Sequence, residues 1–319
     1  MPGLDAYRRR PGHRDDAAPI DLVLVGHVGW ATNENALGTG ASLGGSGYAA
    51  AYAASTVLAG RAGAAGRTGL VAQIGLVAQI GLVAQIGQDL NLHGLRGLGL
   101  DLTGLAVLSG ASARFHLSRL SEAPRVFQSE LGVAATPRFG TFPEPYFRAG
   151  HVHLGTMPPG QQLAWLKFLR DHGFRAPVSV DTFEHFVSTQ PAASREVCDL
   201  ADLIFMNEAE YRGLYRDNEI PKAPTILKHG PRGADFISDG MTHVAVAAPA
   251  VQVVDDTGAG EILAGVYLAL RAHGLAEGRA LGYAVRAASR SVMEFGVDGP
   301  HLTRELTAIQ DEIPGARPA

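Results

Sequence analysis

The sequence has 319 residues, 46% of them hydrophobic and 18% charged, which is enough apolar material for one large α/β domain with a sizeable core. Its formal net charge of -4 gives no basic surplus, so nothing in the composition indicates a nucleic-acid partner. Cys198 is the only cysteine, which excludes an intramolecular disulfide and a cysteine-based zinc site.

The two ends of the chain are predicted to lie outside the folded domain. Residues 1–18 are polar, carry an arginine triplet and lack the apolar core of a signal peptide, so we expect a disordered tail. No stretch of the sequence is long and apolar enough to span a bilayer. We therefore expect a cytoplasmic protein without a membrane partner, with one domain over residues 19–312 and a C-terminal tail over residues 313–319.

Short apolar runs alternate with segments of helical spacing along the chain. Ile20–Gly26 is a continuous apolar run that ends in glycine, as in a strand buried on both faces of a parallel sheet. Similar runs recur at His151–Leu154, Val178–Val180, Leu203–Met206 and Thr225–Leu227. Helical spacing lies between them, over Gly160–His172, Arg195–Leu200 and Ala209–Tyr215. The alternation predicts a doubly wound α/β sheet, in which ligands bind beyond the carboxyl ends of the strands.

One region breaks this alternation. Ala113–Leu120 and Val126–Val133 alternate polar with apolar residues on either side of a short polar segment, which predicts an antiparallel hairpin. An inserted hairpin can cover a site and exclude water. We therefore expect residues 111–134, together with residues 31–45, to form a small β lid. An edge hairpin without a role is the alternative.

Residues 69–86 hold three tandem copies of the sequence GLVAQI. One copy is long enough for a strand, and the 12 additional residues preserve the alternation of faces because 12 is even. A single strand of that length would span roughly 60 Å at about 3.3 Å per residue, which does not fit a compact domain. At least one copy must therefore bulge out of the sheet or pair elsewhere.

The strongest chemical signal is the run Asp255-Asp256-Thr257-Gly258-Ala259-Gly260-Glu261, which precedes an apolar helical segment, Ile262–Arg271. Glycines in this turn let the backbone approach a ligand closely. The free N–H groups and the dipole of a helix N-terminus favour an anion, such as a phosphate in transfer. Glu261 follows directly, where a carboxylate could accept the proton of a substrate hydroxyl. A plain glycine-capped turn is the alternative.

Further polar residues follow the predicted strands and are weak signals on their own. Asn207 and Glu210 come after Leu203–Met206, one helical turn apart, where their oxygens could hold Mg²⁺ through waters. The same pattern is also an ordinary helix N-cap with a capping-box acid. The loop Lys228–Gly233 (KHGPRG) joins two apolar strands through two glycines, as a loop close to a nucleotide would. Asp181 ends another strand and is expected at the same sheet edge, around the phosphates.

The order and spacing of these segments resemble the pfkB, or ribokinase, family. That family combines a Gly-Gly segment near the N-terminus, Asn-x-x-Glu after a strand, a Gly-x-x-Gly loop, and Asp-Thr-x-Gly-Ala-Gly-Asp at the start of a helix. Here the first element is Leu43–Tyr48 (LGGSGY), and the resemblance runs from about Ile20 to about Leu302. It implies a ribokinase-like three-layer α/β/α sandwich with a small β lid, and an ATP-dependent kinase that uses Mg²⁺.

The resemblance also implies roles for individual residues. Catalysis would fall to Glu261 as the base and to an anion hole formed by Gly258, Ala259 and Gly260. Nucleotide contacts would fall to Lys228, Gly230, Gly233, Asp255 and Thr257, and the metal to Asn207 and Glu210. Substrate contacts would fall to Gly44, Gly45 and Ser46. The resemblance further allows a requirement for K⁺ and a homodimer in which the lids of two copies pair.

Three departures from the family pattern matter. The family's base is an aspartate, whereas the Glu261 carboxylate lies one methylene further out, and a misplacement of about 1 Å can lower a rate by roughly 100-fold. Asp256 stands where threonine is usual. The sugar-binding end lacks the aspartate after the first strand, and Ala49 replaces a usual asparagine, so plain ribose is not the expected substrate. Candidate replacements are Trp30, Asn33, Arg114, His116 and Gln128.

We therefore predict an ATP-dependent kinase that transfers the γ-phosphate to a hydroxyl of a small sugar or cyclitol, with Glu261 taking the proton. A nucleoside is the alternative acceptor on the same fold. A catalytically weak metabolite-binding protein on a kinase fold is the second alternative, motivated by the replacement at Glu261 and by the repeat.

Overall fold

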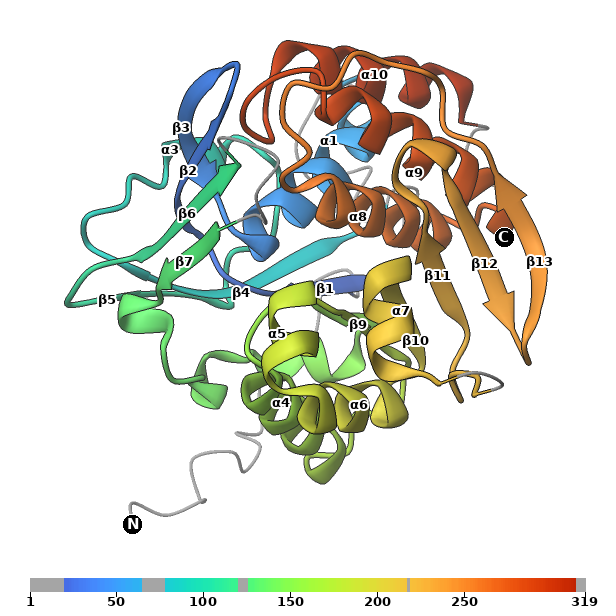
Figure 1. Cartoon of the computed structure of the whole chain (residues 1–319). Coiled ribbons are helices and arrows are strands. Elements are labelled where there is room, and N and C mark those ends of the chain that lie inside the picture. Colours follow the sequence, from blue (N-terminus) through green and yellow to red (C-terminus); the bar gives the residue numbers. More distant parts are fainter. Residues whose placement is uncertain (1–19, 65–77, 120–125, 217–218, 314–319) are drawn as a thin grey trace.

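The computed structural model describes residues 20–64, 78–119, 126–216 and 219–313 (Figure 1). Its main sheet has nine strands in the order β13-β12-β11-β10-β9-β8-β1-β4-β5. Neighbours pair in parallel except for β12, which pairs antiparallel with both β11 and β13. The bounds are β1 (Leu22–Val25), β4 (Ile80–Gly87), β5 (Leu105–Leu108), β8 (His151–Leu154), β9 (Val178–Asp181), β10 (Leu203–Asn207), β11 (Thr225–Lys228), β12 (Ala234–Ser238) and β13 (Met241–Val246).

Helices cover both faces of this sheet, and Figure 1 shows the two sets above and below it. One set comprises α1 (Ser46–Ala64), α8 (Ala259–Ala272), α9 (Glu277–Ser291) and α10 (Pro300–Glu312). The other comprises α4 (Pro159–Asp171), α5 (Glu184–Thr189), α6 (Pro191–Leu200) and α7 (Glu208–Leu214), while the short α3 (His93–Arg96) follows β4. The predicted α/β architecture is confirmed.

Strand β1 shows why a continuous apolar run was the right signal. Successive side chains of a strand point to opposite faces of the sheet. Leu22 and Leu24 belong to the apolar cluster built with α1, α8, α9 and α10, whereas Val23 and Val25 belong to the cluster built with α4, α6 and α7. Both faces of β1 are therefore buried against helices, which is why this strand is apolar at every position.

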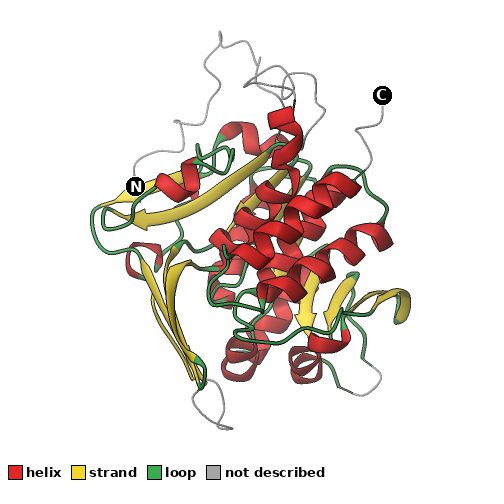
Figure 2. Ribbon diagram, turned by 90° about the horizontal axis from the view of Figure 1, so that it is seen from above, coloured by secondary structure: helices red, strands yellow, loops and turns green. Residues whose placement is uncertain are grey.

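A second sheet stands beside the main body and forms the lid. Its four strands run in the order β3-β2-β6-β7, with β2 (Gly29–Asn35), β3 (Gly38–Gly44), β6 (Ala113–Arg119) and β7 (Val126–Glu130). The predicted hairpin corresponds to β6 and β7, which pair antiparallel, and β6 also pairs in parallel with β2. Figure 2 shows the lid as a thin layer next to the helices of the body.

The last GLVAQI copy, residues 81–86, lies within β4, between β1 and β5. Most of the other two copies and the predicted N-terminal tail lie outside the described residues. At the other end, Ile313, which was expected in the C-terminal tail, is buried in the core with α10. The hydrophobic contacts of the domain therefore extend to this residue.

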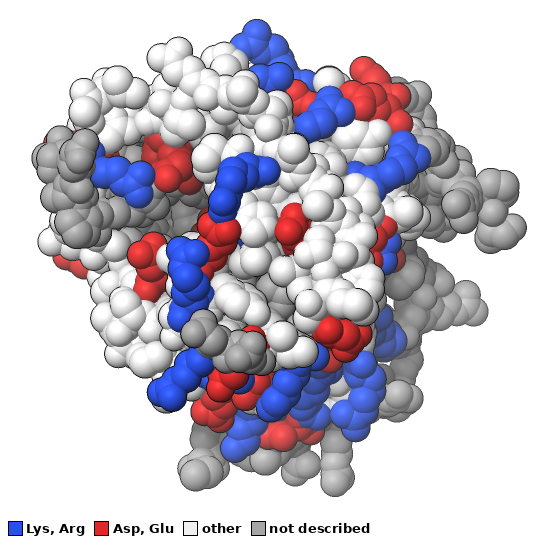
Figure 3. Space-filling model, turned by 45° about the vertical axis from the view of Figure 1, so that its right-hand side comes forward, with Lys and Arg blue, Asp and Glu red and all other residues white. Residues whose placement is uncertain are grey.

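On the face of the molecule in Figure 3, basic and acidic side chains are interspersed. Among the helices of the described ranges, none combines the length and the apolar character needed to cross a membrane.

Candidate active site

A cavity of about 670 Å³ lies between the lid and the carboxyl ends of the main-sheet strands. Five neighbouring parallel strands each contribute a lining residue at or just beyond their carboxyl end: His27 after β1, Thr156 after β8, Asp181 on β9, Asn207 on β10 and Lys228 on β11. Parallel strands bring their carboxyl ends to one edge, which explains why residues so far apart in sequence meet here.

The glycine-rich run forms the turn that begins α8. Gly258 is the N-cap residue and has φ of 83°, in the left-handed region that glycine tolerates best. A Cβ on Gly258 would also lie 2.6 Å from Val297 Cγ1. Thr257, Gly258, Ala259, Gly260 and Glu261 all line the cavity, so the positive end of the helix dipole faces it.

Glu261 lies in the first turn of α8, and its carboxylate has a defined partner. Thr156 Oγ1 donates a hydrogen bond to Glu261 Oε1 at 3.2 Å. Both residues are partly buried and line the same cavity. The predicted base is therefore at the cavity wall, beside the N-terminus of the helix.

A buried ion pair lies next to this turn. Lys228 Nζ is 2.7 Å from Asp181 Oδ1, with 15% of the lysine side chain and 1% of the aspartate side chain exposed. A Cβ on Gly260 would lie 2.9 Å from Lys228 Nζ, so the ammonium group is packed against the helix N-terminus. The ammonium group of Lys228 thus places a positive charge beside the turn that is predicted to hold phosphate.

The surroundings shift the pKa values of both partners. Burial raises the pKa of Asp181 to about 7, with Lys228 opposing the shift and Glu261 and Glu210 adding to it. Burial alone would lower the pKa of Lys228, but Asp181, Glu210 and Glu261 outweigh this effect and raise it. Lys228 therefore keeps its positive charge at neutral pH.

The two predicted metal ligands are bonded to each other. Asn207 is the N-cap of α7, and its side chain accepts from the Glu210 backbone N–H while Glu210 Oε2 accepts from the Asn207 backbone N–H. Glu210 also accepts from Asn207 Nδ2 and from Thr182 Oγ1. Both residues line the cavity but form the capping box that the sequence left as an alternative. The described residues contain no group of three or more His, Cys, Asp or Glu arranged around a metal position.

One oxygen of the Asp181 carboxylate is available to a metal ion or to a water molecule bound to that ion. Its Oδ2 is buried and has no hydrogen-bond partner among the described residues, while Oδ1 contacts Lys228. Carboxylate oxygens are the ligands that Mg²⁺ prefers. Within this set, Asp181 therefore fits a metal contact better than Asn207 or Glu210.

One end of the cavity has small and apolar walls. Gly230 and Gly233 from the loop after β11 line it, with Ala288 and Val292 from the C-terminal half of α9 and its end, and with residues 248–251. The two predicted nucleotide-loop glycines are thus brought to the α8 turn. Small and apolar walls of this kind suit a flat aromatic ring system.

The other end of the cavity is covered by the lid and is rich in aromatic side chains. Phe115 and Leu117 of β6 and Phe127 of β7 line it, together with Phe183 and Phe186 from the body. The Phe127 and Phe183 rings are edge to face, with centroids 4.9 Å apart. Gly44, Gly45 and Ser46, the predicted substrate contacts, line the cavity as well.

Two polar side chains are set into this aromatic end. Burial lowers the pKa of His27 to about 4, so its imidazole is neutral at pH 7 and can both donate and accept hydrogen bonds. Asn33 is buried and donates through Nδ2 to Asp255 Oδ2 at 2.6 Å. Its Oδ1 is an acceptor without a partner among the residues described.

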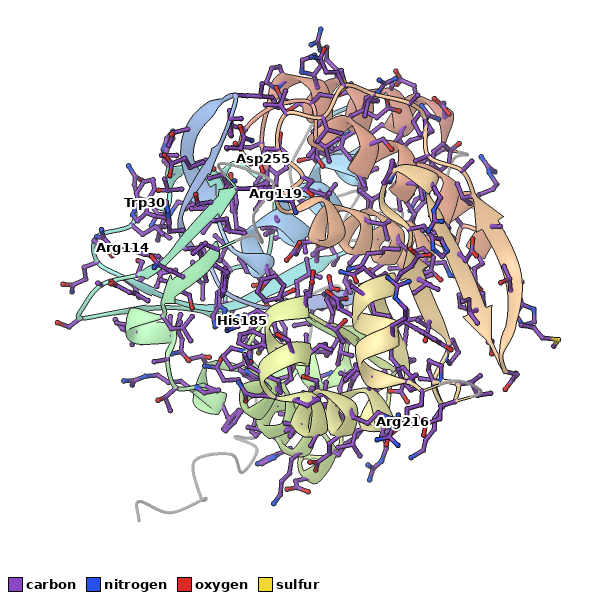
Figure 4. All side chains as sticks on the ribbon, viewed as in Figure 1. Trp30, Arg114, Arg119, His185, Arg216 and Asp255 are labelled. Carbon is purple, nitrogen blue, oxygen red and sulfur yellow. The ribbon has the colours of Figure 1, made fainter. Side chains whose placement is uncertain are left out.

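The lid contacts the glycine-rich turn directly. Asp255 lies behind the turn, where Oδ1 accepts from the Thr257 backbone N–H and Oδ2 accepts from Asn33. Arg119 at the end of β6 is 3.5 Å from Asp256 Oδ2. Figure 4 shows Arg119 and Asp255 where the lid meets the body. Asp255 therefore links the lid to the turn and does not line the main cavity.

Two predicted substrate residues face the other way. Arg114 has 59% of its side chain exposed and lies 3.5 Å from Asp89, and His116 lies 4.0 Å from Glu34. Neither lines the cavity, and Figure 4 shows Arg114 on the outer side of the lid with Trp30. Because faces alternate along a strand, the cavity receives their neighbours Phe115 and Leu117 instead. Gln128, paired with His116 across the lid, is likewise absent from the lining.

Sequence reasoning missed Thr156, His27 and the aromatic end. Thr156 lies two residues beyond a predicted buried strand, at the same carboxyl edge of the sheet as Asn207. His27 follows the first strand in the same way. The aromatic residues gave no such signal, because a phenylalanine in a strand is ordinary core material until the face it occupies is known.

The comparisons with known proteins agree with this fold. The family model for pfkB family carbohydrate kinases matches residues 44–304. A cytidine kinase from Thermococcus kodakarensis is 28% identical over 200 residues, which is 59% of this chain and 69% of that protein. The structure resembles a Burkholderia thailandensis nucleoside kinase in complex with inosine, with TM-score 0.72, 16% identity, and coverage of 91% of this chain and 97% of that one. It also resembles a Cryptococcus neoformans ribokinase in complex with ADP, with TM-score 0.70, 17% identity, and coverage of 92% and 100%. Since the family model covers well over half of the sequence, the chain belongs to the pfkB family of carbohydrate kinases, which are phosphotransferases.

Proposed function

We propose that this protein transfers the γ-phosphate of ATP to a hydroxyl of a nucleoside. The observation that carries the kinase part is the meeting of three features in one cavity: the N-terminus of α8, the Lys228 ammonium group packed against Gly260, and the Glu261 carboxylate. Phosphoryl transfer needs positive groups around the phosphate and a group that accepts the hydroxyl proton.

Each of these groups has a distinct task. The backbone N–H groups of Gly258, Ala259 and Gly260 face the transferring phosphate, and the helix dipole stabilises its negative charge. Lys228 adds a full positive charge at the same place, held by Asp181. Glu261 takes the proton of the attacking hydroxyl, which raises the nucleophilicity of that oxygen.

ATP would occupy the end of the cavity bordered by Gly230, Gly233 and Ala288, with its phosphates directed to the α8 turn. Mg²⁺ would neutralise phosphate charge when it is bound, and Asp181 would hold it directly or through water. Asn207 and Glu210 would support that site through water, because their own side-chain bonds are already made to each other and to Thr182.

The aromatic end of the cavity supports a nucleoside as the acceptor. The sequence alone favoured a free sugar or cyclitol. Phe115, Phe127 and Phe183 offer ring faces and edges to a base, and base stacking on aromatic side chains contributes about 1–3 kcal/mol per base. His27 and Asn33 Oδ1 would hydrogen-bond polar groups of the acceptor. A sugar alone would leave much of this apolar surface unused.

The test is transfer from Mg·ATP by the purified protein to a panel of nucleosides, sugars, inositols and aminocyclitols, with and without K⁺. We expect nucleosides to be phosphorylated. Glu261→Gln should lower kcat by at least about 100-fold while ATP binding persists. Phe127→Ala should raise the KM for the nucleoside by about tenfold. Val126→Ala is the matched control, because Val126 is exposed on the opposite face of the same strand.

The outcomes separate the two parts of the proposal. Transfer to sugars or cyclitols alone would retain the kinase and reject the nucleoside. ATP binding without transfer to any member of the panel would favour the metabolite-binding alternative.

A further inference from the structure

The carboxylate that is predicted to act as the base belongs to Glu261. Its side chain is one methylene longer than the aspartate that is usual in the family. An additional rotatable bond gives the carboxylate more positions to occupy. We propose that Thr156 is a positioning residue that fixes the Glu261 carboxylate for proton transfer. This inference rests on the proposed role of Glu261 as the base.

Thr156 is itself held firmly, as a positioning residue must be. The Gly155 backbone N–H donates to the Val25 carbonyl at 2.9 Å, which ties the segment to β1. The buried Gln162 side chain donates to the Gly155 carbonyl at 3.2 Å. Ser46 Oγ donates to the Thr156 carbonyl at 2.8 Å. The backbone on both sides of the hydroxyl is therefore fixed to three different elements.

The contact between Thr156 and Glu261 suits the longer side chain. Thr156 Oγ1 lies 3.2 Å from Glu261 Oε1, which is already at the long end of hydrogen-bond distances. An aspartate would withdraw the carboxylate by about 1.5 Å, the length of one carbon–carbon bond. It would then lie beyond the reach of the hydroxyl. Holding Oε1 in place leaves Oε2 to face the acceptor hydroxyl and take its proton.

A double-variant cycle tests whether the effect of Thr156 on kcat depends on Glu261. We expect Thr156→Val, which replaces the hydroxyl by a methyl group, to lower kcat by about 10- to 100-fold with the KM for ATP and nucleoside within about twofold. Thr156→Ser should retain activity within a few fold. In a Glu261→Asp background, Thr156→Val should change kcat by less than about twofold, because the contact no longer exists. Thr307→Val is the matched control: Thr307 is exposed on α10, its hydroxyl bonds only to the Thr303 carbonyl in the described structure, and it does not line the cavity.

Two kinetic results would overturn the proposal. A raised nucleoside KM with kcat intact in Thr156→Val would mean that Thr156 contacts the substrate itself. A loss of kcat that is equally large with Glu261 present and in the Glu261→Asp background would mean that Thr156 acts without Glu261.

Crystal structures of the wild type and of Thr156→Val supply a readout that needs no turnover. We expect the Glu261 carboxylate to leave its position at the cavity wall in the variant. An unchanged Glu261 rotamer in both structures would reject the positioning role. If the wild type phosphorylates nothing, the proposed function fails, and the two structures still decide whether Thr156 fixes Glu261.

Discussion

The ion pair between Lys228 and Asp181 gives a strong prediction for stability. Lys228→Met keeps most of the side-chain volume but removes the ammonium group 2.7 Å from Asp181 Oδ1, in a place where only 1% of the aspartate side chain is exposed. Removing one partner of a buried pair destabilises a protein by about 3–5 kcal/mol. We expect a loss in the free energy of unfolding of about this size at pH 7.

The buried Asp181 carboxyl makes the stability of this variant depend on pH. Without Lys228, Asp181 would be buried in its protonated form, whereas it ionises with a pKa near 3.8 in the unfolded chain. Keeping that proton costs about 1.4 kcal/mol per pH unit above 3.8, which is about 4 kcal/mol at pH 7 and about 1.6 kcal/mol at pH 5. Since the folded variant holds a proton that the unfolded chain releases, the free energy of unfolding of Lys228→Met should rise as the pH falls from 7 to 5, relative to the double variant with Asp181→Asn, which has no carboxyl at this position.

Urea unfolding at pH 5 and pH 7 provides the assay, with Asp181→Asn and the double variant alongside. The double variant should recover part of the loss, because a neutral Asn needs no counter-charge. Lys222→Met is the control: its side chain is 69% exposed and pairs with Asp199 at 3.3 Å, so the loss should stay below about 1 kcal/mol. Strict additivity of the two single losses, or the same difference in stability between Lys228→Met and the double variant at both pH values, would refute the reasoning.

Three more predictions concern acid stability, the nucleotide loop and the lid. Burial lowers the pKa of His151 to about 4 and that of His153 to about 3, below the ordinary 6.5, so the unfolded chain takes up these protons first. The free energy of unfolding should therefore fall by about 3 kcal/mol for each histidine between pH 6.5 and pH 4. In His153→Asn, the free energy of unfolding measured in urea should depend less on pH. Gly233→Ala should unfold the nucleotide loop or abolish ATP binding by calorimetry, because its φ is 112° and a Cβ would lie 1.8 Å from the Val246 carbonyl oxygen; normal binding would contradict this backbone conformation. Arg114→Ala should leave kcat and KM within about twofold, since the side chain faces outward, and a tenfold change in KM would show that the lid turns this face to the substrate.

The sequence by itself determined where most of the parallel strands of the main sheet lie and which edge of the sheet borders the cavity. A strand between two helical layers is buried on both faces, so continuous apolar runs such as Leu203–Met206 marked strands of the main sheet. Parallel strands share one carboxyl edge, so the positions of Asp181 and Asn207 at strand ends were enough to predict that both lie at the same edge of the sheet. These inferences depend on short-range patterns and on a general rule of sheet topology.

Tertiary structure decided which residues face each other within the site. The alternation along β6 gives two faces of the strand, but only the docking of the lid makes Phe115 a cavity residue and leaves Arg114 outside. The contact between Thr156 and Glu261 joins residues 105 positions apart, and no local pattern encodes that distance. The GLVAQI repeat is a second case in which local sequence does not decide the tertiary position, because copies with identical sequence have identical local preferences. Only pairing with β1 and β5 places the last of them in the sheet.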